Sequence, residues 1–411
     1  MATEESALDA RQMAGFKDFY QFICTTRVIA GRGLIEGAGF EFSKEGAKRI
    51  LVVTDEVIRG TGLIDRVEAG VTDGGLEVAG VFDDVPQDSA TDVVARCAEA
   101  AREQDADSFL AVGGGSVMDT AKAANVLFTH GGEIRDWEGF YGLPREDDGL
   151  GRPLPLAPLA AIPTTAGTGS EVSFAAVVKD HEEHLKMEVA DFPMFPAVAI
   201  LDPEATRTLP AAIAASTGMD AMTHAIEGYV SSEWNPHADA CALQALRLIS
   251  RNLRRAVEDT SDDEARGNML IAASLAIVPT GSGAIGITHS MSHPCGGHYG
   301  VAHGVANAIN LPHVIRFNVA GGADIADRYR DVGEVLGVET GGSDDAVGEA
   351  LAAHVTDLIG ALGLPSRLSE VGVPEEGIPR LVEGAMGDGC TIVNPREPSE
   401  EDFAELYRAA L

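Results

Sequence analysis

Basic residues are scarce in this sequence, and lysine is the scarcer of the two basic types. The 411 residues include 30 Lys and Arg against 64 Asp and Glu, which gives a formal net charge of −34. Only six of the basic residues are lysine. A surface this negative repels nucleic-acid phosphates and anionic lipid headgroups. The composition therefore argues against nucleic acids and membrane surfaces as partners.

Cysteine pairs and long apolar runs are also missing. The five cysteines are widely spaced and no two form a Cys-x-x-Cys pair, which is typical of reduced thiols rather than of a disulfide scaffold. The first residues, MATEESALDARQ, have neither the basic start nor the apolar stretch of a signal peptide. No apolar run approaches the length of a membrane span. We therefore expect a cytoplasmic protein without a membrane segment.

The pattern of apolar residues changes at the middle of the chain. Up to about residue 205, short apolar strands alternate with helical patterns, which predicts an α/β fold with a parallel sheet. Beyond it, strand signals are few and long helical patterns dominate. The chain is also too long for one ordinary core. We predict an α/β domain at residues 1–207 and an all-helical domain at 208–411, with a cleft between them.

Each half has its own predicted elements. In the first half we expect strands at 49–55, 76–82, 108–115, 172–180 and 197–202, and helices at 89–104 and 116–130. In the second half we expect helices at 211–231, 237–259, 263–279, 302–318, 343–361 and 399–410.

Two glycine-rich loops follow strands of the first half. GGGS, at 113–116, joins a strand to a helix, where backbone amides and the helix dipole favour phosphate. PTTAGTGSE, at 163–171, is dense in hydroxyls and glycine and follows an apolar strand. Two such loops at strand ends of one sheet can hold a dinucleotide from both sides. The spacing is not Gly-x-Gly-x-x-Gly, however, and Ser116 with Asp119 also matches a capping box that starts the helix.

Asp55 ends the first clear strand. An acidic side chain there can accept hydrogen bonds from an adenosine ribose and repel a 2′-phosphate, which favours NAD over NADP. For Asp55 taken alone, a strand-end aspartate that begins a turn is the simpler interpretation.

The stretch ITHSMSHPCGGHYGVAHG, residues 287–304, holds four of the eleven histidines. His289 and His293 are four apart, so both imidazoles lie on one face if the segment is helical. Pro294 disfavours an unbroken continuation of that helix. The glycines that follow allow His303 to return toward the same point, whereas nothing in its spacing assigns a role to His298, which we interpret as a loop residue.

A metal ion at this stretch needs ligands from elsewhere, because Cys295 is the only nearby thiol and a Cys₂His₂ pattern is absent. Asp220 and His224, four apart in TGMDAMTHAIE, are the best candidates, although Asp-x-x-x-His on a helix is usually a surface pair. One carboxylate and three imidazoles suit a borderline divalent ion such as Fe²⁺ or Zn²⁺. A substrate oxygen can add to such a Lewis-acid site.

Four motifs occur in order along the chain: GGGSVMDTAK, PTTAGTGSE, TGMDAMTHAIEGYVS and HSMSH…AHG. Together they resemble the iron-containing (group III) alcohol dehydrogenases, and the resemblance runs from about residue 15 to the end, including DGCTIVNPREPS. It implies a dinucleotide-binding α/β domain and a helical metal-binding domain with the active site in the cleft between. One position departs from the family: in VPQDS, at 85–89, Gln87 stands where asparagine is usual.

The resemblance also implies roles for individual residues. His293 would lie near the nicotinamide as a proton relay. Cys390 would line the substrate pocket, with a buried structural thiol as the equal alternative. The metal, Fe²⁺ before Zn²⁺, would be bound by Asp220, His224, His289 and His303. NAD would be contacted by Asp55, Gly114, Gly115, Ser116, Asp119, Thr164, Thr165, Thr168, Lys186 and Leu209.

The activity implied by the resemblance is reversible hydride transfer between NAD and a small alcohol, diol or hydroxyacid, which gives an aldehyde or ketone. Two alternatives stay open. One is a hydroxyacid–oxoacid transhydrogenase of the same family, in which the cofactor stays bound; the other is a metal-dependent hydrolase that does not use NAD. A homodimer or higher homo-oligomer is the expected assembly.

Overall fold

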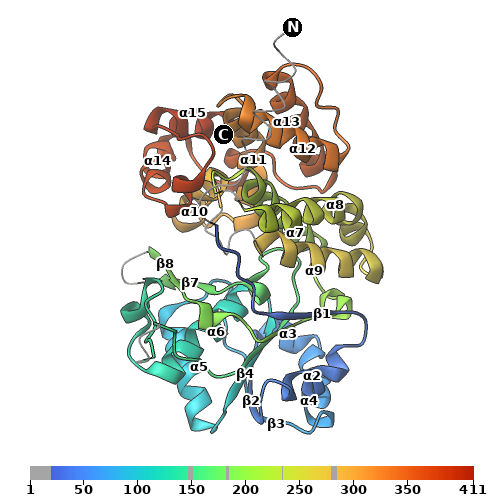
Figure 1. Ribbon diagram of the computed structural model, residues 1–411, viewed down its shortest axis with the longest axis vertical. Coiled ribbons are helices and arrows are strands. Elements are labelled where there is room, and N and C mark those ends of the chain that lie inside the picture. The colour runs from blue at the N-terminus through green and yellow to red at the C-terminus, as the bar shows by residue number, and fades with distance from the viewer. Residues whose placement is uncertain (1–19, 147–150, 182–184, 234, 279–284) are drawn as a thin grey trace.

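The computed structural model describes residues 20–146, 151–181, 185–233, 235–278 and 285–411. It has two parts, an α/β domain in the lower half of Figure 1 and a largely helical region in the upper half. This architecture confirms the predicted fold class. None of the described helices is long and apolar enough to cross a membrane.

A six-stranded sheet in which every pairing is parallel forms the centre of the α/β domain. Its strands run in the order β1 (Arg27–Ala30), β9 (Val198–Leu201), β6 (Leu159–Pro163), β4 (Ser108–Gly113), β2 (Arg49–Val53) and β3 (Glu77–Phe82). Every residue of β4 and β6 is buried. Their apolar sequences follow from this position, because a central parallel strand is covered on both faces.

Helices cover both faces of this sheet, and alternate strand residues point to opposite sides. Ile50 and Val52 pack with α2 (Ala38–Ser43) and α4 (Leu63–Asp73). Leu51 and Val53 pack in the other layer, with α5 (Thr91–Glu103) and α6 (Gly115–His130). A short helix, α3 (Glu56–Gly60), directly follows β2.

A second, three-stranded sheet corrects one prediction. The apolar run at 172–180 does form a strand, β7 (Ala175–Asp180), but it pairs antiparallel with β8 (Leu185–Ala190) and not with the main sheet. The short strand β5 (Gly139–Phe140) completes this sheet. The exposure of β7 alternates along the strand, unlike that of β4, because one face of the small sheet is open. The strands β1, β5 and β8 were not predicted.

The helical region begins with a buried central helix and confirms most of the predicted helices. No strand is assigned among the described residues after Leu201. Asn235 caps α8 through its side chain, with Pro236 as the first helical residue. Three of the helices, α10, α12 and α14, were not among those predicted. In order the helices are α7 (Ala211–Val230), α8 (Pro236–Glu258), α9 (Asp263–Ile277), α10 (Ile287–Tyr299), α11 (His303–Val319), α12 (Ala323–Leu336), α13 (Asp344–Ala361), α14 (Ile378–Met386) and α15 (Glu400–Ala410).

The expectation that Pro294 interrupts the histidine helix is wrong. Helix α10 continues through Pro294 to Tyr299 and ends at Gly300, which has a left-handed φ of 66°. Pro294 is buried against α14, where a Cβ added to Gly384 would lie 2.8 Å from the Cβ of Pro294. This packing keeps the helix intact despite the hydrogen bond that a proline cannot make.

Candidate active site

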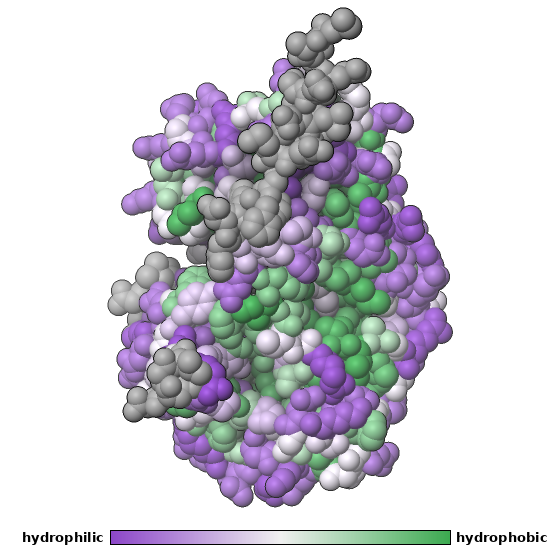
Figure 2. Space-filling view, in the orientation of Figure 1, coloured by the Kyte–Doolittle hydropathy of each residue, from purple (hydrophilic) through white to green (hydrophobic). Residues whose placement is uncertain are grey.

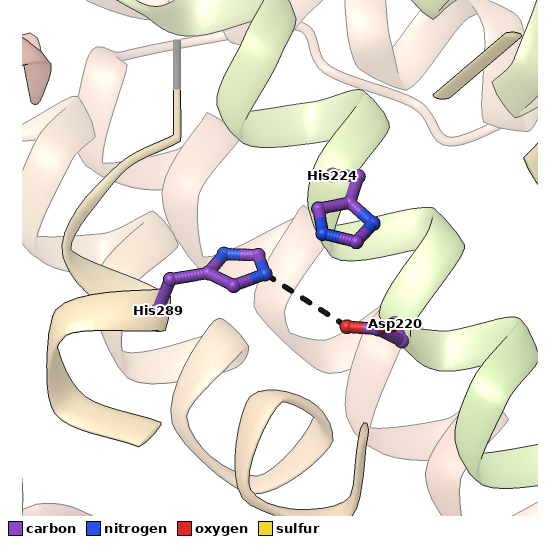
Figure 3. Close-up of side chains that lie close together, drawn as sticks. All are labelled: Asp220, His224 and His289. Carbon is purple, nitrogen blue, oxygen red and sulfur yellow. Dashed lines mark ion pairs between the residues drawn. The ribbon is translucent and has the colours of Figure 1, made fainter. Parts of the chain in front are cut away.

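The four candidate metal ligands come from three helices that meet in the helical region. Asp220 and His224 lie one turn apart on α7, His289 lies on α10, and His303 is the first residue of α11. Figure 3 shows the side chains of Asp220, His224 and His289 facing one another, and their ligand atoms lie within 4.8 Å of one another. Oδ1 of Asp220 is 3.8 Å from Nε2 of His289 and 3.4 Å from Nε2 of His303. The structure therefore brings all four predicted ligands together.

Burial sets the charges of this cluster. It lowers the pKa of His224 to about 4 and the pKa of His303 well below its ordinary value, so both imidazoles are neutral at neutral pH and keep a lone pair. Burial opposes ionisation of Asp220 as well, but the imidazoles of His224 and His303, which are protonated in the acid range where this carboxyl titrates, hold its pKa below its usual range. At neutral pH the cluster thus offers one carboxylate and the neutral rings of His224 and His303.

Glu227, on the same helix as Asp220, orients His289. Its Oε2 lies 2.5 Å from Nδ1 of His289, and its Oε1 accepts a hydrogen bond from the backbone of Thr288. Against the effect of burial, Glu227 and Asp220 raise the pKa of His289 to about 9. Without a bound cation His289 therefore carries protons on both ring nitrogens at neutral pH. The carboxylate of Glu227 keeps the proton on Nδ1, and a cation would displace the proton on Nε2, which lies toward Asp220, to give the arrangement found around metal-bound histidines.

The donor set fits a divalent ion. His224 is buried, and one of its ring nitrogens lies within 4.8 Å of the ligand atoms of Asp220 and His289. The other ligand atoms converge within a few ångströms, with a mixture of oxygen and nitrogen that suits Fe²⁺ or Zn²⁺.

His293 lies beside the cluster and is held by a carboxylate of its own. Its ring is stacked on His303, with centroids 5.4 Å apart, and its Nδ1 lies 2.6 Å from Oδ2 of Asp388. The side chain is 37% exposed, so the ring joins the buried cluster to solvent. The ligand atoms of His293, Asp388 and Cys390 also lie within 4.8 Å of one another, which places Cys390 at this edge of the site.

The two glycine-rich loops lie side by side, as the sequence predicted. Gly113 at the end of β4 pairs with Pro163 at the end of β6. A Cβ added to Gly115 would lie 2.9 Å from Cγ2 of Thr168, so only glycine allows the loops to approach this closely. Helix α6 begins here, with free amides that suit a phosphate. This edge of the sheet fits a dinucleotide.

The second loop also reaches the metal-ligand helix. A Cβ added to Gly167 would lie 2.5 Å from Cβ of Thr217, which precedes Asp220 by about one turn of α7. The nucleotide loop and the metal cluster are therefore parts of one site.

The capping-box interpretation of Ser116 and Asp119 is wrong. Helix α6 begins at Gly115 with Gly114 as its cap, so Ser116 is already inside the first turn. The hydroxyl of Ser116 instead donates to the backbone oxygen of Gln87. Asp119 accepts hydrogen bonds from the hydroxyl of Ser170 and from the backbone of Val177, and so ties α6 to the second loop and to β7.

Asp55 lies at the end of β2, on the same edge of the sheet as both loops, and has the simpler of its two predicted roles. Its Oδ1 accepts a hydrogen bond of 2.8 Å from the backbone of Ile58 and caps α3. This cap does not exclude a contact with the ribose, because a carboxylate has a second oxygen.

Two further predicted contacts lie around the loops. Lys186, on β8, pairs with Asp88 at 3.2 Å, next in sequence to Gln87. Leu209 lines a small hollow between the two halves, together with Ala166 and Arg266. Apolar side chains gather across this middle zone in Figure 2. Thr164 is buried, and its backbone donates to Gly113.

Sequence reasoning missed three residues of the site: Glu227, Asp388 and Asn307. Glu227 follows His224 by three residues and Asn307 follows His303 by four, so helical spacing could have placed each on a ligand-bearing face. Asp388 contacts His293 from 95 residues away, and no local pattern signals that contact. His298 is exposed, as expected, but lies in the last turn of α10 rather than in a loop.

Comparisons with known proteins agree with this geometry. The sequence model of "Iron-containing alcohol dehydrogenase" matches residues 25–203, and that of "Fe-containing alcohol dehydrogenase family, C-terminal" matches residues 214–411. The chain is 37% identical over 384 residues to the NAD-dependent methanol dehydrogenase of Bacillus methanolicus, covering 93% of this chain and 97% of that relative. It is 39% identical over 370 residues to the 1,3-propanediol dehydrogenase of Klebsiella pneumoniae, covering 89% and 92% respectively.

A solved structure gives the same result. The crystal structure of a 1,3-propanediol oxidoreductase superposes with a TM-score of 0.90 at 35% sequence identity, over 96% of this chain and all of that one. The converging carboxylate and imidazoles, the paired glycine loops and these matches lead to one conclusion. The chain belongs to the iron-containing alcohol dehydrogenase family and is an oxidoreductase.

Proposed function

We propose that this protein transfers hydride reversibly between a small alcohol and NAD, with the help of a divalent metal ion. The observation that carries the proposal is the convergence of three buried residues, Asp220, His224 and His289, with the partly exposed His303, beside the two glycine-rich loops. Relatives named for methanol, 1,3-propanediol and lactaldehyde support a substrate of few carbons. In this proposal residues 1–207 bind the dinucleotide and residues 208–411 bind the metal.

The residues divide into three groups. Asp220, His224, His289 and His303 would hold the ion, with Fe²⁺ preferred and Zn²⁺ second. When bound, the ion supplies Lewis-acid chemistry at the substrate oxygen and the nicotinamide accepts the hydride. The dinucleotide would be held by Asp55, Gly114, Gly115, Ser116, Asp119, Thr164, Thr165, Thr168, Lys186 and Leu209.

His293 would move the proton. Asp388 holds a hydrogen at Nδ1 of His293 through their 2.6 Å contact, which leaves Nε2 as the atom that takes the alcohol proton. The partial exposure of the ring lets that proton pass on to water. Burial of Asp220, His224 and His289 limits the access of water to the place where the substrate oxygen would be held.

We also propose a homodimer in the cytoplasm. The edge strand β1 leaves Val28 44% exposed, and an uncovered sheet edge is a natural contact for a second copy. The five cysteines are all free thiols, which supports a reducing compartment.

The test is an activity panel on protein of known metal content. The protein is stripped with a chelator, checked for residual metal and reloaded with Fe²⁺, Zn²⁺ or Mn²⁺. Alcohols, diols and hydroxyacids of one to four carbons are then assayed with NAD and NADP. We expect activity with NAD that disappears on stripping and returns on reloading. Full activity in verified metal-free protein would overturn the metal role.

Two other results would select different functions. Turnover between a hydroxyacid and an oxoacid without added NAD would identify a transhydrogenase. Absence of NAD binding in a calorimetric titration would exclude a dehydrogenase.

A further inference from the structure

A fifth polar side chain ends among the four candidate ligands. Asn307, on α11, is completely buried. Its Nδ2 lies 2.7 Å from Oδ1 of Asp220 and 3.2 Å from Nε2 of both His289 and His303. No other described residue is shown in contact with these three donor atoms at once.

These separations match those between atoms that share one metal ion. Ligands bound at about 2.1 Å lie roughly 3.0–3.4 Å apart, depending on whether the geometry is octahedral or tetrahedral. Oδ1 of Asp220 is 3.4 Å from Nε2 of His303, which is within this range, and 3.8 Å from Nε2 of His289, which is slightly wider. The end of the Asn307 side chain is at a comparable distance from each of them. It therefore occupies the place of a further ligand.

The two ends of the amide differ in what they can do there. Nδ2 carries two hydrogens and no free lone pair, so it cannot bind a cation, whereas Oδ1 is an acceptor with two lone pairs. Oδ1 of Asn307 is buried and has no hydrogen-bond partner among the described residues. A half-turn about the last side-chain bond exchanges the two atoms without changing the shape of the group. With a cation bound, that turn gives the unsatisfied oxygen a partner, and Nδ2 gives up its contact with Asp220.

We propose that Asn307 turns its side-chain oxygen toward the bound cation and acts as an additional donor beside the three imidazoles and Asp220. The inference rests on the proposed metal site and deepens it. A second oxygen donor raises the number of ligands above the four that Zn²⁺ prefers in closed protein sites. It therefore favours ions that accept five or six ligands and oxygen donors, such as Mn²⁺ and Fe²⁺, over Zn²⁺.

Three variants of the full-length, metal-stripped protein test this proposal. Asn307→Leu keeps the approximate size and removes both polar atoms, and Asn307→Asp keeps oxygen at the site. Asn310→Leu is the matched control, because Asn310 is a buried amide on the same helix that contacts Ser292 and none of the four ligands. Co²⁺ is the probe; its affinity is measured by competition with a chelator and its coordination by the visible absorption of the loaded protein.

We expect Asn307→Leu to weaken Co²⁺ binding by about tenfold or more, by analogy with the loss of other groups that support a metal site. Its absorption bands should intensify, because Co²⁺ absorbs more strongly when it has fewer ligands. Asn307→Asp should keep the wild-type affinity or exceed it, and Asn310→Leu should match the wild type in both measurements.

Wild-type affinity and spectrum in Asn307→Leu would overturn the proposal. A weaker affinity with an unchanged spectrum would also overturn it, because that pair of results indicates a hydrogen-bond donor to Asp220. If Asn307→Leu does not fold, a tenfold loss of affinity in Asn307→Asp overturns it instead. Failure of the wild-type protein to bind Co²⁺ would refute the metal site itself and is distinguishable from all of these results.

Discussion

Glu227 and His289 form a buried pair, with 2.5 Å between Oε2 of the carboxylate and Nδ1 of the ring, and each residue is at most 2% exposed. A carboxylate in this position fixes which ring nitrogen keeps its proton and increases the basicity of the other. Because both partners lie in low-dielectric surroundings, neither can be removed without leaving the other unsatisfied. The pair therefore acts on the metal although Glu227 does not itself face the ion.

Replacing Glu227 by glutamine should weaken metal binding by about 10- to 100-fold, because the neutral amide no longer supports the proton on Nδ1 of His289. Chelator competition followed by metal analysis measures the change. Glu376→Gln, an exposed position away from the site, is the control. Unchanged affinity in Glu227→Gln would show that the pair serves folding alone.

Asp388→Asn tests the proton relay. If Asp388 holds His293 for proton transfer, the variant should lose about 10²- to 10⁴-fold in kcat, the usual contribution of a general acid–base group. His293→Ala should lose a similar amount, and the double variant little more, because residues that act as one unit are not additive. Additive losses in steady-state kinetics would separate the two residues.

Asp55→Asn tests the preference for NAD. The amide oxygen can still cap α3 through the backbone of Ile58, so stability should change little. Removal of the charge should raise kcat/KM for NADP by about five- to tenfold, the effect of roughly 1 kcal/mol of charge repulsion. The ratio of kcat/KM for NADP and NAD is the measurement. An unchanged ratio would place the 2′-position of the cofactor away from Asp55.

Lys122 lies on α6, the helix that follows the first glycine-rich loop. It links this helix to the second glycine-rich loop below the proposed nucleotide site. It is completely buried, and its ammonium donates to the hydroxyls of Ser170 and Ser173 and to the backbone of Ala175. Lys122→Met would leave the buried carboxylate of Glu171 without its cation and remove the larger of two cationic effects on Asp119, where Lys186 remains. We expect the free energy of unfolding to fall by about 3–5 kcal/mol, measured by denaturant titration. Lys48→Met, at an exposed lysine, should change it little.

The same lysine predicts a pH dependence. Burial lowers the pKa of Lys122 to about 8, against opposing effects of Asp119 and Glu171. Between that value and the ordinary 10.5, the unfolded chain binds more protons than the folded one at this position. Stability contributed by Lys122 therefore rises as the pH increases from about 8 to 10.5. The difference in unfolding free energy between wild type and Lys122→Met should widen over this range, and a constant difference would contradict the prediction.

Patterns over a few neighbouring residues predicted the features that depend only on those residues. The apolar runs of β2 and β4 and the glycines before α6 identified a parallel sheet with a phosphate-type loop. Because residues four apart lie on one face of a helix, the sequence predicted that Asp220 lies beside His224 and that His289 lies beside His293. The resemblance then joined these pairs into one site. The ligand set itself, however, requires segments some seventy residues apart to meet, which spacing alone does not determine.

Features that depend on contacts between residues far apart in the sequence were missed or predicted wrongly. Pro294 lies inside α10 and packs against Gly384, ninety residues later, where a larger side chain would collide with its ring. The sheet to which β7 belongs depends on its pairing with β8, since an apolar run does not specify its neighbour. Asp388 reaches His293 only after α10 packs against the C-terminal segments. In each example the contact that determines the structure is made by a residue far away in the sequence. A pattern of neighbouring residues does not reveal such a contact.

The order of strands also has a consequence during synthesis. Strand β1 pairs along its whole length with β9, so that Arg27 lies opposite Val198. A ribosome adds about 5–20 residues per second, so β1 is made roughly ten to thirty seconds before β9, its neighbour among the described strands. During that interval the nascent chain carries an extended segment with open backbone groups, and its protection falls to chaperones rather than to the fold.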